Sequence, residues 1–144
     1  MSYGLHDFLR DTITELREHS PLTDLLDEPQ AITEGWPHDT QSYPAVVRVQ
    51  PITETSSKAA HNFQTVNKLF RAQVSVVVTQ SWRNDQDAPT YRQAEIMAAA
   101  GDPLDQGLEP ENLLPEGSAG ASWSDVEGGR LALIQDWRIR RYTR

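Results

Sequence analysis

The residues near the start of the chain repeat with the period of an α-helix. Six positions at three- and four-residue spacing form one face: Leu5, Phe8, Leu9, Thr12, Ile13 and Leu16. Charged side chains fill the opposite face, so the pattern predicts an amphipathic helix. Ser20 followed by Pro21 is typical of a helix start, and it predicts a short second helix that ends before Pro29.

Two later segments alternate apolar and polar residues, which is the pattern of a β-strand with one buried face. The first is residues 45–50. The second, residues 69–79, places Phe70 and Val76 on one face with polar side chains opposite. About sixteen mostly polar residues, 53–68, separate the two strands. This separation is far longer than a usual hairpin turn, so it predicts a long loop.

A further helical segment follows the second strand. A proline near its start and small residues along its length predict a helix from residues 87–89 to Gly101, with Pro103 just beyond its end. The next segment, residues 102–120, is acidic and contains three prolines and several glycines. This composition predicts a long surface loop and leaves its role open.

Gly128 and Gly129 separate two alternating segments, residues 122–126 and 131–142, and this pattern predicts a tight hairpin. In the last strand, one face carries Leu131, Leu133, Trp137 and Ile139. The other face carries Ala132, Ile134, Asp136, Arg138, Arg140 and Tyr142. The order of elements predicts a single α+β domain over residues 1–144, with an antiparallel sheet of about four strands, helices packed on one face, and long loops.

The composition excludes several classes of protein. The chain has 144 residues, no cysteine and a formal net charge of −8, so disulfides, cysteine-based metal sites and thiol chemistry are excluded. Eleven arginines accompany two lysines, which is typical either of salt-loving organisms or of an ordinary acidic protein that its charge keeps soluble. No apolar run approaches the roughly 20 residues of a membrane-spanning helix. We expect no signal peptide and a product that stays in the cytosol where it is made.

No motif in the chain predicts catalysis. The four histidines lie in different predicted elements, without the spacing of a metal-binding pair. Residues 116–120 read EGSAG, which lacks the Gly-x-Ser-x-Gly order of a nucleophile elbow. The patterns of calcium and phosphate loops are also missing. We therefore predict no catalytic residue, no metal site and no cofactor, and a protein that is not an enzyme.

Four arginines lie within the last seven residues of this acidic chain: Arg138, Arg140, Arg141 and Arg144. Such a cluster is expected of a cationic edge that meets an acidic surface of another subunit, or of a solvated strand end. DNA contact is a weaker third option. In the long predicted loop, Lys58, His61 and Lys68 are placed to reach a partner. Trp36 and Trp82, at the ends of predicted elements, are either interface anchors or side chains packed at the core margin.

The order of the parts resembles the tail-terminator (tail-completion) proteins of long-tailed phages and archaeal tailed viruses. The resemblance covers most of the chain. It rests on an early leucine-rich helix, LHDFLRDTITEL, the short SPLTDLL turn, YPAVVRV before the first strand, FRAQVSVVVTQSW after a long loop, and the closing strand RLALIQDWRIRRY. The acidic segment 102–120 is longer than that layout leads one to expect.

The resemblance implies a structural virion protein. In that family the protein forms a hexameric ring that caps the growing tail tube, ends its polymerisation and presents the surface that joins the neck of a DNA-filled head. The implied partners are further copies of the chain, the tail-tube protein and a neck or head-completion protein. Duplex DNA would pass the lumen without specific binding, because an acidic wall offers few contacts to phosphate. The implied location is the virion, after assembly in the host cytoplasm, and the acidic composition suits a halophilic host.

Two other interpretations stay open at this point. Another neck component, such as a head-closure or head-tail adaptor protein, would share the ring and the acidic lumen. A small hydrolase with a site assembled around His38 and Asp39 represents a different class of function.

Overall fold

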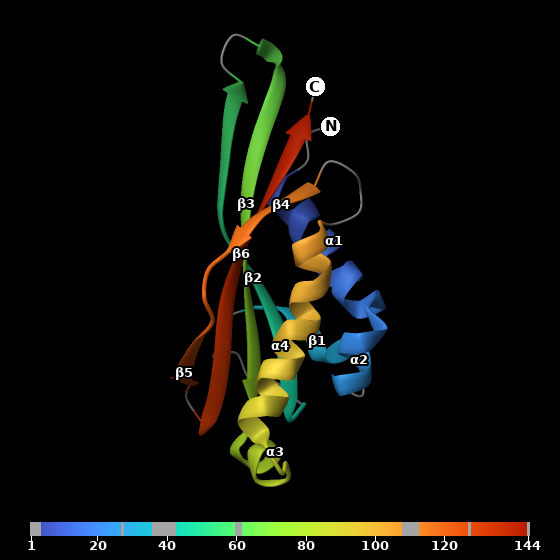
Figure 1. Cartoon of the computed structure of the whole chain (residues 1–144), viewed down its shortest axis with the longest axis vertical. Helices are drawn as coiled ribbons and strands as arrows, with labels where there is room; N and C mark the ends of the chain where they lie inside the picture. Colours follow the sequence, from blue (N-terminus) through green and yellow to red (C-terminus); the bar gives the residue numbers. More distant parts are fainter. Residues whose placement is uncertain are drawn as a thin grey trace.

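A six-stranded sheet with helices on one face forms the body of the protein (Figure 1). The computed structural model describes residues 4–26, 28–35, 43–59, 62–107, 113–126 and 128–143. The strands are β1 (Ile32–Glu34), β2 (Ala45–Ala59), β3 (Asn62–Val78), β4 (Leu113–Ser118), β5 (Ser122–Val126) and β6 (Arg130–Thr143). The helices are α1 (Leu5–Glu18), α2 (Ser20–Leu26), α3 (Gln80–Asn84) and α4 (Pro89–Gln106), with a 3₁₀ turn at Pro29–Ala31.

The strands lie in the order β1-β2-β3-β6-β4, and β5 pairs with the same strand, β6, as β4 does. β1 runs parallel to β2, and the remaining pairs are antiparallel. The helix α1 packs against β2, and α4 packs against β3 and β6. The predicted α+β class, with helices on one face of a largely antiparallel sheet, is therefore confirmed.

The sheet has six strands where about four were predicted. One addition, β1, has three residues and is too short to show an alternating pattern. The other, β4, lies inside the predicted surface loop 102–120 and occupies an edge of the sheet. Pro115 is tolerated there because an edge strand needs N–H donors on one side alone.

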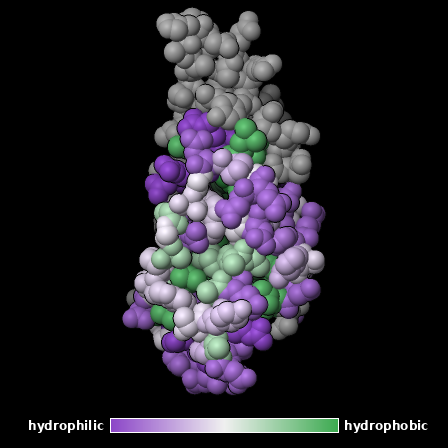
Figure 2. Space-filling model, viewed as in Figure 1, coloured by the Kyte–Doolittle hydropathy of each residue, from purple (hydrophilic) through white to green (hydrophobic). Residues whose placement is uncertain are grey.

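The core lies between the sheet and the helices. Phe8 of α1 stacks on Phe70 of β3, with ring centroids 4.6 Å apart. Gln93 of α4 is fully buried, and its Nε2 donates hydrogen bonds to the carbonyl oxygens of Val76 (2.7 Å) and Leu131 (3.0 Å). These two bonds fix α4 across β3 and β6. On the surface of this side, apolar residues gather across the middle and hydrophilic residues surround them (Figure 2).

The helix α4 continues to Gln106, past its predicted end at Gly101. The glycine is needed for packing rather than for termination, because a Cβ there would lie 2.7 Å from Cζ2 of Trp137. The following turn includes Pro103 and the fully buried Leu104, whose burial stabilises the extra turn. The prediction of a loop directly after Gly101 was therefore wrong.

The predicted loop 53–68 is also wrong, because β2 and β3 pair through most of it. Their register runs from Ala45 opposite Val78 to Ala59 opposite Asn62, with shifts after Pro51 and after Lys58. Figure 1 shows the resulting hairpin projecting beyond the helices. Main-chain pairing does not require apolar side chains, so these polar parts of the strands lack the alternating pattern that would predict them.

The predicted tight hairpin between residues 122–126 and 131–142 is confirmed. β5 and β6 pair antiparallel, with Val126 opposite Arg130. Gly128 and Gly129 between them have φ values of +80° and +74°. Glycine adopts positive φ without a steric penalty, so the Gly-Gly pair suits the connection between these strands.

Candidate functional site

One face of the strand β6 is covered by α4, and the other face is directed away from the helices. On the helix side, Trp137 is 3% exposed, and its Nε1 donates a 2.8 Å hydrogen bond to Oδ1 of Asp105 in α4. Because side chains alternate along a strand, Arg138 and Arg140 lie on the opposite, outer face of the sheet. We call the outer-face cluster of Arg71, Arg138 and Arg140 the arginine face.

Arg140 is engaged within its own chain. Its Nε and Nη2 donate to the two carboxylate oxygens of Glu116 in β4, both at 2.9 Å. Glu116 follows Leu114 by two positions and lies on the outer face with it, next to a β-bulge between Pro115 and Gly117. Hydrogen bonding to Arg140 lowers the pKa of Glu116, against an opposing effect of desolvation, and the charges of Arg140 and Arg138 lower it further. The acidic segment whose role the sequence left open thus supplies a partner for one of the C-terminal arginines.

The other two arginines of this face lie directly opposite each other, Arg71 on β3 and Arg138 on β6. Arg71 is balanced by Asp136, with Nη2 and Oδ2 2.9 Å apart. Arg138 is exposed, and among the described residues it forms no ion pair. Gly117 lies close by, since a Cβ there would be 3.9 Å from the Arg138 guanidinium. Arg138 is therefore the cation that the arginine face leaves available to a partner.

The remaining basic candidates are placed by their backbone or fall outside the described residues. Lys68 lies opposite Arg141 in the register of β3 and β6, so two predicted basic positions are neighbours near the end of the sheet. Lys58 lies further out on the hairpin, opposite Val66. The predicted candidates Trp36, His61 and Arg144 lie outside the described residues.

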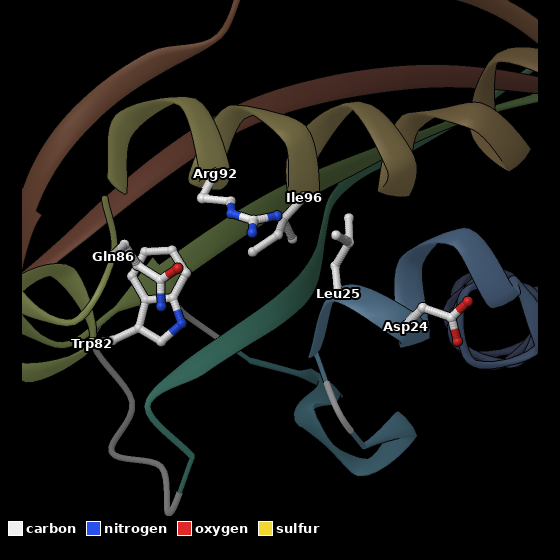
Figure 3. A pocket seen from close by; sticks show the side chains of 6 residues that line it. All are labelled: Asp24, Leu25, Trp82, Gln86, Arg92 and Ile96. Carbon is white, nitrogen blue, oxygen red and sulfur yellow. The ribbon is translucent and has the colours of Figure 1, made fainter. Parts of the chain in front are cut away.

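Trp82 lies in α3, at the end of the body opposite the C-terminus of β6 (Figure 1). The backbone N–H of Trp82 donates a 3.1 Å hydrogen bond to Oγ1 of Thr79, which thereby caps the helix. The half-buried ring packs against the core and lines a cavity of about 210 Å³. Figure 3 shows the side chains that line it: Asp24, Leu25, Trp82, Gln86, Arg92 and Ile96. Trp82 thus packs at the margin of the core while its ring stays partly accessible. It does not belong to the arginine face.

Sequence reasoning missed the contribution of β4 to the arginine face. Leu114 lies opposite Arg140 in the register, so both belong to the outer face, and Leu114 is 51% exposed. Its neighbour Leu113 points the other way and is 2% exposed. Two adjacent leucines within an acidic segment were the available signal of a strand with one buried face.

Among the described residues, no group of three or more metal-ligating side chains is close enough to hold a metal ion. None of the described helices is long and apolar enough to cross a membrane. His38 and Asp39, the centre of the hydrolase interpretation, lie outside the described residues.

Comparisons with known proteins give a full-length likeness to a solved structure. No family model matches the chain, and no curated protein matches it. The fold is similar to that of a chain in the solved structure of the virion of a native gene transfer agent (GTA) particle, with a TM-score of 0.66. The likeness covers 98% of this chain and 99% of that chain at 17% sequence identity. The two chains therefore share a fold over their whole length.

Proposed function

We propose that this chain is a structural virion protein, a single α+β domain that forms a ring at the end of a tail tube. The ring, a hexamer by the family resemblance, caps the tube, ends tail polymerisation and joins the tail to the neck. Its partners are then further copies of the chain, the tail-tube protein and a neck or head-completion protein. Duplex DNA passes through the lumen without specific binding, and the protein acts in the virion after assembly in the host cytoplasm.

The observation that carries this proposal is the full-length likeness to a chain of the GTA virion, at 98% and 99% coverage. It agrees with the independent resemblance of the sequence to tail-terminator proteins. A likeness confined to a common substructure would leave large parts of one chain unmatched, whereas here both chains match from end to end.

Two features of the fold suit a ring subunit. The paired ends of β2 and β3 form a projecting hairpin that extends beyond the helices, as an element that reaches a neighbour would. Arg138 is exposed and forms no ion pair among the described residues of this acidic chain, which favours contact with acidic protein surface.

Purified protein tests the proposal directly. Light scattering and negative-stain imaging across a range of salt concentrations, with and without tail-tube protein, should reveal closed rings and rings seated on tube ends. Tubes polymerised with the protein present should stop at a shorter, narrower range of lengths. A monomer under all these conditions would contradict the proposal.

The same experiment separates the main alternative, another neck component. A head-closure or adaptor protein would also form rings, but it would leave the tube length distribution unchanged. The order of neighbouring genes gives a second criterion, because a position just upstream of a tail-tube gene favours the terminator role.

A further inference from the structure

The helix layer contains a groove whose charge is opposite to that of the arginine face. It lies between the C-terminal ends of α1 and α4, has a volume of about 430 Å³, and is lined by Glu15, Glu18, His19, Pro103, Gln106 and Gly107. Glu18 is exposed and Glu15 is half-buried, and among the described residues neither forms an ion pair. The groove thus presents two uncompensated carboxylates beside a concave surface.

The arginine face has the complementary arrangement. Its own carboxylates, Glu116 and Asp136, already bind Arg140 and Arg71. What this face offers to a partner is the guanidinium of Arg138, together with the exposed side chain of Leu114, which lies opposite Arg140 on the same face. Phosphate-rich nucleic acid is a poor match, because the two carboxylates adjoin the one available cation.

We propose that the arginine face of one copy docks into the groove between α1 and α4 of a second copy, with Arg138 paired to Glu15 and Glu18. This inference rests on the proposed function and specifies the contact between subunits. The groove lies in the helix layer, whereas Arg138 lies on the opposite face of the sheet. Arg138 therefore cannot reach the groove carboxylates of its own chain. A contact between two different surfaces repeats from copy to copy and closes into a ring when the rotation allows it.

Charge exchange tests the contact in the full-length protein. Arg138→Glu places a carboxylate against carboxylates, and it should raise the protein concentration needed for half-assembly by more than about tenfold. The double variant Glu15→Arg with Glu18→Arg should fail in the same way. Arg92→Glu is the matched control, since Arg92 is an exposed arginine of α4 outside both surfaces, and its assembly should stay native.

Mixing the two defective proteins gives the decisive result. An Arg138→Glu copy and a Glu15→Arg, Glu18→Arg copy can alternate around a ring, because each junction then joins opposite charges. In the equimolar mixture, the concentration needed for half-assembly should return to within about threefold of the native value, as measured by light scattering. Circular dichroism should show that each variant is natively folded.

The outcomes distinguish the contact from the function. If native protein forms rings but Arg138→Glu assembles normally, or the mixture stays unassembled, the proposed contact is overturned and the proposed function stands. If native protein never assembles, even with tube protein, both are overturned.

Discussion

The two faces of β6 show how one strand serves packing on one side and recognition on the other. On the helix side, the Trp137 ring lies against Gly101, and its N–H binds Asp105 at 2.8 Å. On the outer side, Arg140 is tied to Glu116 and Arg138 is left exposed. Close packing therefore stabilises the helix face, whereas solvent-accessible ion pairs connect the side chains of the outer face.

The difference predicts where substitutions cost stability and where they do not. Close-packed contacts lose both transfer energy and packing when a side chain changes. Solvent-accessible ion pairs contribute little, because water screens them. Substitutions on the helix face should therefore change the stability of the fold, and substitutions on the outer face should change assembly.

Truncation of the buried tryptophan should have the largest effect. Trp137→Ala removes a ring that is 3% exposed and leaves Asp105 without its donor, so we expect the free energy of unfolding to fall by about 3–5 kcal/mol. Urea denaturation followed by circular dichroism measures the change. Trp123→Ala is the matched control, since Trp123 is 45% exposed, and it should cost about 1 kcal/mol or less. Equal losses for the two variants would contradict the tight packing of the Trp137 ring.

Adding one methyl group to the same contact should have the next largest effect. Gly101→Ala places a Cβ 2.7 Å from Cζ2 of Trp137, so the helix or the ring must shift, at a cost of about 1–3 kcal/mol. This loss would override the usual gain of alanine over glycine within a helix. Gly120→Ala is the control, because no atom lies within 4 Å of the added Cβ. A melting temperature that rises for Gly101→Ala would contradict the tight packing described above.

Gly101 also illustrates how far the sequence predicts this fold. Periodicity located α1, α2, the body of α4, the core of β2 and β3, and the hairpin between β5 and β6. It failed where tertiary contacts decide the local structure. A glycine followed by a proline is the usual sign of a helix end, but here the glycine makes room for Trp137, which lies 36 positions later in the chain.

The candidate site was predicted in part for the same reason. The two faces of β6 followed from strict alternation, so Arg138 and Arg140 were correctly assigned to one face. The pairing of Arg140 with Glu116 was missed, because it depends on β4 and its bulge, and those residues were interpreted as a loop. Neither the ion pair nor the exposure of Arg138 follows from spacing along the chain.

The ion pair should show itself through pH rather than through a large loss of stability. The pKa of Glu116 in the folded protein lies below its ordinary value of 4.5, so folding favours the ionised carboxylate. Its contribution is full above that ordinary value and is lost as the pH falls through the lowered pKa. Glu116→Gln should therefore be less stable than the native protein near neutral pH, and the gap should close in acid once the pH falls below the lowered pKa.

Denaturation midpoints of both proteins at several pH values test this prediction. Arg140→Gln should weaken the same pH dependence, because it removes the largest cause of the lowered pKa. A gap between native protein and Glu116→Gln that persists unchanged in acid would assign the effect to something other than the charge of Glu116.

Removal of the exposed arginine should have the smallest effect on folding. Arg138 lies directly opposite Arg71, and like charges at facing positions repel. Because attraction to Glu116 opposes this repulsion, Arg138→Ala should change the free energy of unfolding by no more than about 0.5 kcal/mol. Arg71→Ala provides the contrast, because it leaves Asp136 without its partner. If Arg138→Ala unfolds at clearly lower urea than the native protein, Arg138 belongs to the structural framework, and the outer face loses its distinction from the helix face.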